Sequence, residues 1–285
     1  MKNALRIISV ILAILIAVIP FSSAFAAEEK LNYLVLGDSI GFGAGIVNPD
    51  EACYGRIVAD TNGYNYKNFS VNGYSTDALL AHIKLPTVKE AITEADIISL
   101  SIGGNDFLMS NLICLMFDSI VKNDHTEFDR IAEGFYTNFC EIVDIINSHN
   151  EDAVILMQTL YNPQSGYLRA PYQEGADRIN TAIERYSTEN PGEIVIVDVA
   201  SALGDDMANF ADDEIHPSAQ GNEIIADTVL DKLHELSLGR DSTPVIAAKG
   251  EDIEIPAIFT ASLRIAGAVF NAISVIYNFF TGIFG

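Results

Sequence analysis

The sequence predicts an α/β domain in which a parallel sheet is covered by helices on both faces. Between residue 30 and about residue 238, short apolar runs alternate with stretches of helical periodicity, a pattern typical of parallel strands joined by helices. The hydrophobic content of 49% and the charged content of 19% are those of a globular protein. Glycines and polar side chains follow several of the apolar runs, which is where ligands bind in such sheets.

Five apolar runs are predicted as strands, of which the second is the weakest. They span residues 31–36, 64–69, 96–101, 153–158 and 193–198. Helical periodicity predicts the main helices at residues 52–62, 87–94, 128–148, 176–188 and 217–236. Because the chain has 285 residues, a catalytic domain over residues 27–238 leaves room for a further segment at each end.

The N-terminal segment, residues 1–26, has the layout of a secretory signal peptide. Lys2 and Arg6 precede an apolar run over residues 7–19, and a stretch of small residues ends at Ala26. Cleavage there would start the mature protein near Ala27, outside the cytoplasm. An uncleaved N-terminal anchor is the alternative, although the apolar run is short for a membrane span. We therefore expect an extracytoplasmic protein that is secreted or held at the cell surface or membrane.

The C-terminal residues predict a hydrophobic, amphipathic helix. Residues 239–255 form a polar linker, and residues 256–285 carry a single charge, Arg264. On a helix, Asn271 and Ser274 fall on one thin polar stripe, while the rest of the surface is apolar. Such a helix can lie in a membrane interface, associate within the bilayer or pack against protein, and the sequence leaves these alternatives open.

Charge and cysteine content exclude several classes of function. The chain has 39 acidic and 16 basic residues, a net charge of −23, and it shows no basic patch with interleaved aromatics. We therefore expect no nucleic-acid partner. The cysteines Cys53, Cys114 and Cys140 match neither a disulfide framework nor a zinc pattern. They are predicted as buried small hydrophobic residues, with one bridged pair outside the cell as the alternative.

Ser39 is the candidate nucleophile. It stands in the sequence Gly37-Asp38-Ser39, directly after the first predicted strand. A strand-to-helix junction at this point would place the hydroxyl at the mouth of the sheet, near a helix N-terminus that favours negative charge. Taken alone, the motif fits an ordinary helix cap equally well.

Two further strand ends offer hydrogen-bond donors. Gly73 follows the second predicted strand, and a glycine there lets the backbone approach a ligand and present its N–H. Asn105 follows the third strand in the sequence GGND, and its side-chain amide suits an oxyanion hole. Each of these motifs also fits a turn or a capped loop.

His216 is the candidate general base. It precedes Pro217, which suits the first turn of a helix, so the histidine is predicted to lie on a loop. Asp213 can reach the imidazole from within that loop, fix its tautomer and stabilise the imidazolium. Asp212 and Glu214 flank Asp213, so the choice of acid rests on the offset of three residues from the histidine. The other four histidines lie in helical or polar stretches and lack this setting.

Together these four motifs resemble those of the SGNH, or GDSL, hydrolases, in order and rough spacing over residues 31–236. The resemblance implies a flavodoxin-like, three-layer α/β/α domain that hydrolyses esters through an acyl-enzyme, without a metal or other cofactor. It implies that Ser39 is the nucleophile, that His216 acts as base and then as acid, and that Asp213 orients His216. The oxyanion would be held by the backbone N–H groups of Ser39 and Gly73 and by the side chain of Asn105.

The resemblance leaves the substrate open. An apolar C-terminal helix near a membrane would suit a lipid-type ester such as a lysophospholipid or acylglycerol. An exported acidic enzyme could equally be a carbohydrate acetylesterase that acts on polysaccharide or cell wall. Tyr54, Tyr74 and Phe107 lie close to the motifs and are candidates for either the pocket wall or the core. A non-catalytic surface binding protein with the same fold is the hypothesis from another class.

Overall fold

A computed structural model of the chain describes residues 30–108, 110, 115, 118–255, 268, 269, 272, 273 and 275. The predicted signal peptide, Cys114 and most of the predicted C-terminal helix lie outside the described residues. Within these residues, every helix is too short or too polar to cross a membrane. Cys53 is buried, Cys140 is half-buried, and both are free thiols.

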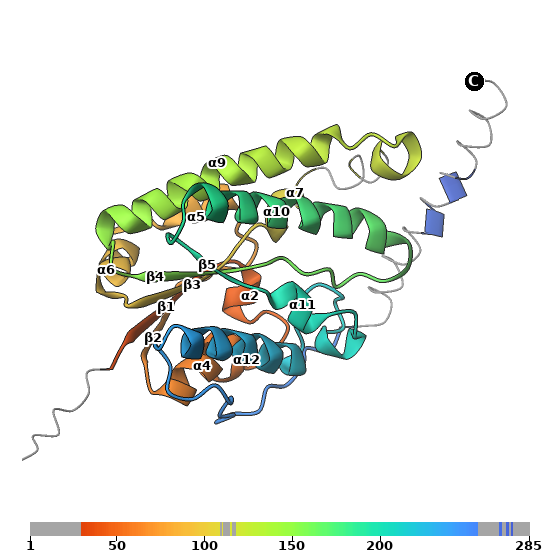
Figure 1. The fold of residues 1–285 in the computed structure, drawn as a ribbon. Coiled ribbons are helices and arrows are strands. Elements are labelled where there is room, and N and C mark those ends of the chain that lie inside the picture. Colours follow the sequence, from red (N-terminus) through yellow and green to blue (C-terminus); the bar gives the residue numbers. More distant parts are fainter. Residues whose placement is uncertain are drawn as a thin grey trace, which may run out of the picture. The chain divides into compact units, whose positions relative to one another are not determined.

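The domain is built on one sheet of parallel strands (Figure 1). The strands are β1 (Asn32–Gly37), β2 (Asn65–Asn68), β3 (Ile97–Ser101), β4 (Val154–Gln158) and β5 (Val195–Val197). Their order across the sheet is β2-β1-β3-β4-β5, and each neighbouring pair is parallel. This is the doubly wound order of flavodoxin-like folds, and it confirms the predicted fold class. All of the predicted strands are present, although β2 and β5 are shorter than predicted.

Helices cover both faces of this sheet (Figure 1). One face is covered by α4 (Tyr54–Asn62), α11 (Val199–Leu203) and α12 (Ala219–Glu235). The other is covered by α5 (Thr76–His82), α6 (Pro86–Glu94), α9 (Thr126–His149) and α10 (Arg169–Glu189). The remaining described elements are short: α2 (Ser39–Phe42), α3 (Pro49–Ala52), α7 (Gly104–Leu108), a π-helical turn η1 (Asp118–Lys122), and the 3₁₀ turns η2 (Gly166–Leu168) and η3 (Met207–Asn209).

Strand β1 shows how the sheet separates two hydrophobic cores. Tyr33 and Val35 pack into the core shared with α4 and α12, whereas Leu34 and Leu36 pack into the core shared with α9 and α10. All four side chains are at most 1% exposed. A strand that is buried on both faces is a continuous apolar run in the sequence, which is the pattern that predicted it.

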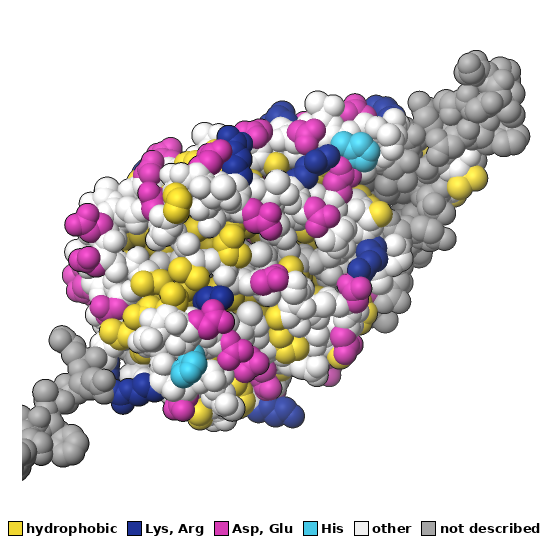
Figure 2. Space-filling model, viewed as in Figure 1, with side chains coloured by type: hydrophobic (Ala, Val, Ile, Leu, Met, Phe, Trp, Pro, Cys, Tyr) yellow, Lys and Arg dark blue, Asp and Glu magenta, His cyan; other side chains and the backbone are white. Residues whose placement is uncertain are grey.

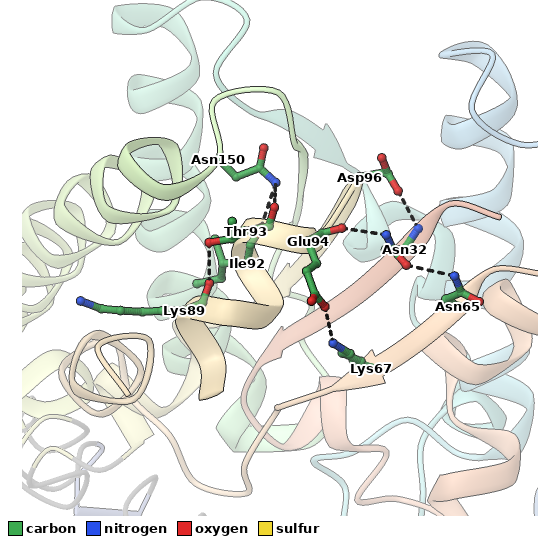
Figure 3. Close-up of polar contacts among 9 residues, drawn as sticks. All are labelled: Asn32, Asn65, Lys67, Lys89, Ile92, Thr93, Glu94, Asp96 and Asn150. Atoms are coloured by element: carbon green, nitrogen blue, oxygen red, sulfur yellow. Dashed lines mark hydrogen bonds and ion pairs between the residues drawn. The ribbon is translucent and has the colours of Figure 1, made fainter. Parts of the chain in front are cut away.

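Side-chain amides close the edge of the sheet at which the strands begin (Figure 3). Asn150, which follows α9, donates from Nδ2 to the carbonyls of Ile92 and Ala95 at 2.9 and 2.7 Å. Asn32 of β1 donates in the same way to the carbonyl of Glu94 at 2.8 Å. Carbonyls at a helix C-terminus lack intrahelical partners, so these bonds satisfy the end of α6 and join it to the sheet.

The surface carries acidic and basic side chains side by side (Figure 2). Several basic groups are paired with acids, as in the contacts of Arg185 with Glu133 and Glu189, each with an N–O distance of 3.0 Å. On the visible face of the described residues, acidic side chains separate the basic ones. The net charge of −23 disfavours the approach of polyanions.

The polar stretch after α12, predicted as a linker, is irregular but lies along the domain. Asn62, at the end of α4, accepts a hydrogen bond at Oδ1 from the backbone N–H of Arg240 at 2.7 Å. Thr61 Oγ1 accepts one from the N–H of Val245 at 2.9 Å. Residues 240–245 are therefore held against α4 by specific bonds and are not a free connection.

Candidate active site

A cleft of about 510 Å³ lies at the edge of the sheet where the strands end. Its walls come from the segments that follow β1, β2, β3 and β4, and from the loop before α12. Ser39, Gly73, Asn105 and His216 all line this cleft, and Asp213 contacts His216. The structure therefore brings together all of the site residues that the sequence predicted.

The turn that carries Ser39 requires glycine at its start. Gly37 has a φ of +136°, and a Cβ atom at this position would lie 1.9 Å from the carbonyl oxygen of Ser101 on β3. Only a glycine allows β1 to pass this close to its neighbour and turn into α2. Asp38 is the N-cap of α2, and its carboxylate accepts a hydrogen bond from the N–H of Ile40 at 3.0 Å. Ser39 thus stands at the first position of a capped helix and is 8% exposed.

Asp38 is buried directly beside Ser39. Burial raises the pKa of Asp38 to about 7, although bonds from Ile40 and Ser101 and the nearby His216 lower it in part. The Ser101 hydroxyl donates to Asp38 at 3.3 Å and accepts from the N–H of Gly41 at 3.0 Å. Ser101 therefore joins the acid to the backbone of α2, and burial favours the protonated form of Asp38.

Contacts between α7 and the loop before α5 hold the two predicted oxyanion donors together. Asn105 donates from Nδ2 to the carbonyl of Tyr74 at 2.9 Å, next to Gly73, whose φ is +80°. The carboxylate of Asp106 accepts from both the backbone N–H and the hydroxyl of Thr76. Burial raises the pKa of Asp106 to about 6, partly offset by these bonds from Thr76. The loop after β2 and the turn after β3 are therefore locked to each other.

His216 and Asp213 form a close pair within one loop. Asp213 Oδ2 lies 2.5 Å from His216 Nδ1, and Oδ1 accepts the backbone N–H groups of Ile215 and His216, each at 2.9 Å. Burial alone would raise the pKa of Asp213, but the contacts with His216 and Ile215 outweigh it and lower that pKa. Asp212, one residue earlier, is exposed. Asp213 is thus a carboxylate that holds the imidazole through Nδ1.

The apolar wall of the cleft includes residues that sequence reasoning missed. Leu108, Leu160, Tyr161 and Tyr172 line it together with Ile215. The hydroxyl of Tyr161 donates to the carbonyl of Ile215 at 2.9 Å, which fixes this wall to the loop of His216. No sequence signal separated these residues from core residues, because apolar and aromatic types serve both purposes.

The aromatic residues considered for the pocket wall lie elsewhere. Tyr54 and Phe107 are 0% and 1% exposed and belong to the cores. Tyr74 packs edge-on against His82, with ring centroids 5.3 Å apart. Their closeness to the motifs in sequence therefore reflects packing beneath the site, and the apolar wall of the cleft comes from other residues, including Leu108, Leu160 and Ile215.

A second cavity, of about 600 Å³, lies on the other side of the connection between β4 and α10. It shares Leu160 and Tyr161 with the cleft, but its lining is mostly amide, hydroxyl and carboxylate side chains. Asn180, for example, bonds through its side chain to both the N–H and the carbonyl of Leu160. Since this cavity is not lined by Ser39 or His216, the smaller cleft is the candidate active site.

A doubly wound α/β domain with serine, histidine and amide side chains at the carboxyl edge of its sheet belongs to a recognisable class of acyl hydrolases. The chain belongs to the GDSL-like lipase/acylhydrolase family, whose sequence model matches residues 35–224. It is 26% identical over 221 residues to the spore germination lipase LipC of Bacillus licheniformis, and the matched region covers 74% of this chain and 98% of that relative.

Solved structures show the same fold. The lipase Lip_vut3 from a goat rumen metagenome superposes with a TM-score of 0.58 at 24% identity, over 74% of this chain and 99% of that one. An extracellular lipase from Streptomyces rimosus gives a TM-score of 0.57 at 17% identity, over 71% of this chain and 99% of the other. These likenesses confirm the three-layer α/β/α fold, and family membership supports an acyl hydrolase that acts on ester bonds.

Proposed function

We propose that this protein is a serine ester hydrolase in which Ser39 is the nucleophile and His216 the general base. The observation that carries the proposal is that Ser39 and the imidazole bonded to Asp213 line the same cleft. In the first step, Ser39 Oγ attacks the ester carbonyl while His216 Nε2 takes its proton and passes it to the departing alcohol. In the second step, water loses a proton to the same nitrogen, attacks the acyl-enzyme and releases the acid.

Asp213 is proposed to set the state of the base. A carboxylate 2.5 Å from Nδ1 favours the tautomer in which Nδ1 carries the proton, so Nε2 is free to accept one from Ser39. The same negative charge stabilises the imidazolium that forms during the attack. Because Asp213 is itself held by two backbone N–H groups, the orientation of the pair is fixed before substrate binds.

The backbone N–H groups of Ser39 and Gly73 and the side chain of Asn105 are the proposed oxyanion donors. An amide side chain carries two N–H bonds, and Asn105 gives one of them to the carbonyl of Tyr74. The second N–H remains for the carbonyl oxygen on which negative charge develops, since Asn105 lines the cleft. Donors fixed in advance in this way stabilise the tetrahedral intermediate without reorganisation.

A lipid-type ester is the proposed substrate. The wall formed by Leu108, Leu160 and Tyr172 suits an aliphatic acyl chain, and the cleft volume exceeds what an acetyl group needs. LipC and Lip_vut3 are both named as lipases, which favours the same substrate class. Acetyl release from a glycan is the alternative, and it would leave most of this apolar wall unused.

Fluorophosphonate labelling followed by peptide mapping tests the mechanism. We expect label on Ser39 of the purified protein, no label after Ser39→Ala, and at least a hundredfold slower labelling after His216→Ala, roughly the scale of losing a general base. Ser75→Ala, at the cap of α5, is the matched control and should label normally. A well-folded parent protein that does not label would refute the mechanism and favour a binding protein with this fold.

A series of acyl esters with one leaving group tests the substrate class. We expect kcat/KM to rise from acetyl through butyryl to octanoyl esters, because each added methylene buries apolar surface against the wall. A preference for acetyl esters, together with acetate release from acetylated xylan, would contradict the lipid-type assignment and favour the acetylesterase.

Export and membrane contact are part of the same proposal. Cleavage after Ala26 would leave a mature protein that starts at Ala27, and residues 256–285 would then contact a lipid surface. N-terminal sequencing and cell fractionation test both points. An intact N-terminus would contradict cleavage, and a full-length protein that stays soluble beside vesicles would contradict the membrane contact.

A further inference from the structure

We propose that residues 250–253, which we call the C-terminal strap, position His216 for catalysis. The inference rests on the proposed roles of Ser39 and His216. The strap lies beyond residues 35–224, the part of the chain that matches the family. Its contribution would therefore come from outside the segment that matches the family.

The strap pairs with the loop that follows α2. Ile46 and Asp252 form an antiparallel β-bridge. The backbone N–H of Val47 donates to the carbonyl of Glu251 at 2.7 Å, and the N–H of Ile253 donates to the carbonyl of Gly45 at 3.1 Å. Two segments that are about 200 residues apart in sequence are thus joined by backbone hydrogen bonds.

The loop that follows α2 also contacts the segment that carries His216. A Cβ atom built on Gly45 would lie 1.9 Å from the carbonyl oxygen of Pro217 and 3.1 Å from Cβ of His216. The backbone at Gly45 therefore contacts the His216 segment with no room for a side chain. Ala44, the preceding residue, lines the cleft itself. Holding Gly45 in place consequently fixes one side of the histidine loop.

A second contact joins the strap to the start of α12. Asp252 Oδ1 accepts the backbone N–H of Ala219 at 2.5 Å, three residues after His216. Gly250 packs on the same residue, because a Cβ atom there would lie 2.8 Å from Cβ of Ala219. The first N–H groups of a helix have no intrahelical partner, and a carboxylate at this end is favoured by the helix dipole. The strap is thus linked to the His216 segment in two ways, indirectly through Gly45 and directly through Ala219.

The topology explains why this segment needs support. Ser39 follows β1, whereas His216 follows β5, and β3 and β4 lie between them. The three strand spacings from β1 to β5 amount to roughly 14 Å. The loop that carries His216 extends over this distance from β5 towards Ser39, and its end is not attached to a strand. On its other side the loop is held by a bridge between Phe210 and Pro217 and by the N–H of Ala211, which donates to the carbonyl of His216 at 2.8 Å. The strap supplies further contacts through Gly45 and Ala219.

Substitution of Asp252 in the full-length chain tests the proposal. We expect Asp252→Ala to lower kcat on a short-chain aryl ester by about three- to tenfold, with KM unchanged, because it removes one exposed helix-capping acceptor. Asp252→Asn keeps an acceptor oxygen and should restore most of kcat. Glu254→Ala, which removes an exposed acid just outside the strap, is the matched control and should match the parent protein. Recovery with asparagine would identify the hydrogen bond, and not the charge, as the cause.

A backbone substitution provides the second test. Ile253→Pro removes the N–H that bonds to Gly45, and it should slow the fluorophosphonate labelling of Ser39 by about tenfold. Glu254→Pro introduces the same ring one residue later and should leave the labelling rate near that of the parent. Circular dichroism verifies that each variant is folded.

The outcomes separate the two proposals. If folded Asp252→Ala and Ile253→Pro keep kcat and labelling within about twofold of the parent, the positioning role is overturned. If Asp252→Ala alone does not fold, Ile253→Pro decides by the same criterion. If the parent protein itself does not label at Ser39, the proposed function fails first.

Discussion

Replacing Asp213 by asparagine tests the acid of the proposed triad with the smallest change in shape. Oδ1 accepts two backbone N–H groups at 2.9 Å, and asparagine can keep both bonds through its carbonyl oxygen. The other oxygen, 2.5 Å from His216 Nδ1, becomes an NH₂ group that can only donate. The imidazole then has to accept at Nδ1 and carry its proton on Nε2, so it cannot take a proton from Ser39.

The size of the effect follows from this change of tautomer. A comparable exchange in serine hydrolases costs about 10⁴ in kcat, so we expect a loss of about 10³–10⁴ for Asp213→Asn. The loss of fold stability should be small, about 1 kcal/mol, because a charge-assisted bond is replaced while the loop keeps its backbone contacts. A large loss of activity with little loss of stability is the signature of a tautomer effect.

The assay compares kcat on a short-chain aryl ester with the midpoint of urea unfolding. Asp212→Asn is the matched control, because it removes the same charge one residue earlier from an exposed side chain, and it should keep nearly full activity. If Asp213→Asn retained kcat within about tenfold of the parent, or if Asp212→Asn were the inactive variant, the assignment of the acid would be refuted.

Three further predictions test other parts of the structure. Asn105→Ala should lower kcat on the same ester by about 10²–10³, the scale of one oxyanion donor, and an unchanged kcat would remove Asn105 from the site. Burial raises the pKa of Asp38 from 3.8 to about 7, so the folded state binds this proton more tightly than the unfolded state does. The contribution of this proton to the free energy of unfolding is therefore present below about pH 4 and is lost as the pH rises through 7. In Asp38→Asn, the fall in unfolding free energy between pH 4 and pH 8 should therefore be smaller than in the parent by up to about 4 kcal/mol. An equal fall in both proteins, measured by urea unfolding at each pH, would contradict this. Asn150→Ala leaves the carbonyls of Ile92 and Ala95 without their side-chain donor (Figure 3). It should lower the free energy of urea unfolding by about 1–3 kcal/mol and leave kcat unchanged. A large fall in kcat would contradict the conclusion that the end of the sheet where the strands begin is separate from the active site.

Local patterns in the sequence were sufficient for the elements that bury continuous or periodic apolar surface. β1, β3 and β4 are buried on both faces, so their sequences are mostly apolar and their positions were predicted to within a residue or two. Helix α10 begins at Arg169, earlier than the predicted 176, because Pro171 and Gly175 interrupt the helical periodicity in its first turns. Proline in the first turn is compatible with a helix, but it conceals the start of one from a periodicity search.

The cleft wall and the strap depend on contacts that no local pattern records. Tyr161 and Tyr172 are aromatic residues in segments whose sequences would suit the core equally well, and only the tertiary fold places them in the same cleft as Ser39. The bridge between Ile46 and Asp252 joins segments with no strand-like alternation, and its bonds run through the backbone, which is the same for every residue type. Gly45 was the one available signal, since a glycine in a loop often marks a close backbone approach.

The order of the strands explains how separate weak motifs become one site. In the sequence Ser39 comes first, followed by Gly73 and Asn105, but in the sheet β1 lies between β2 and β3. The strand before Ser39 is therefore flanked by the strands that precede Gly73 and Asn105, the proposed oxyanion donors. No local pattern contains this order, because each motif by itself fits an ordinary cap or turn. The histidine is the exception, since its strand lies at the far edge of the sheet, and its position depends on loop contacts such as those of the strap.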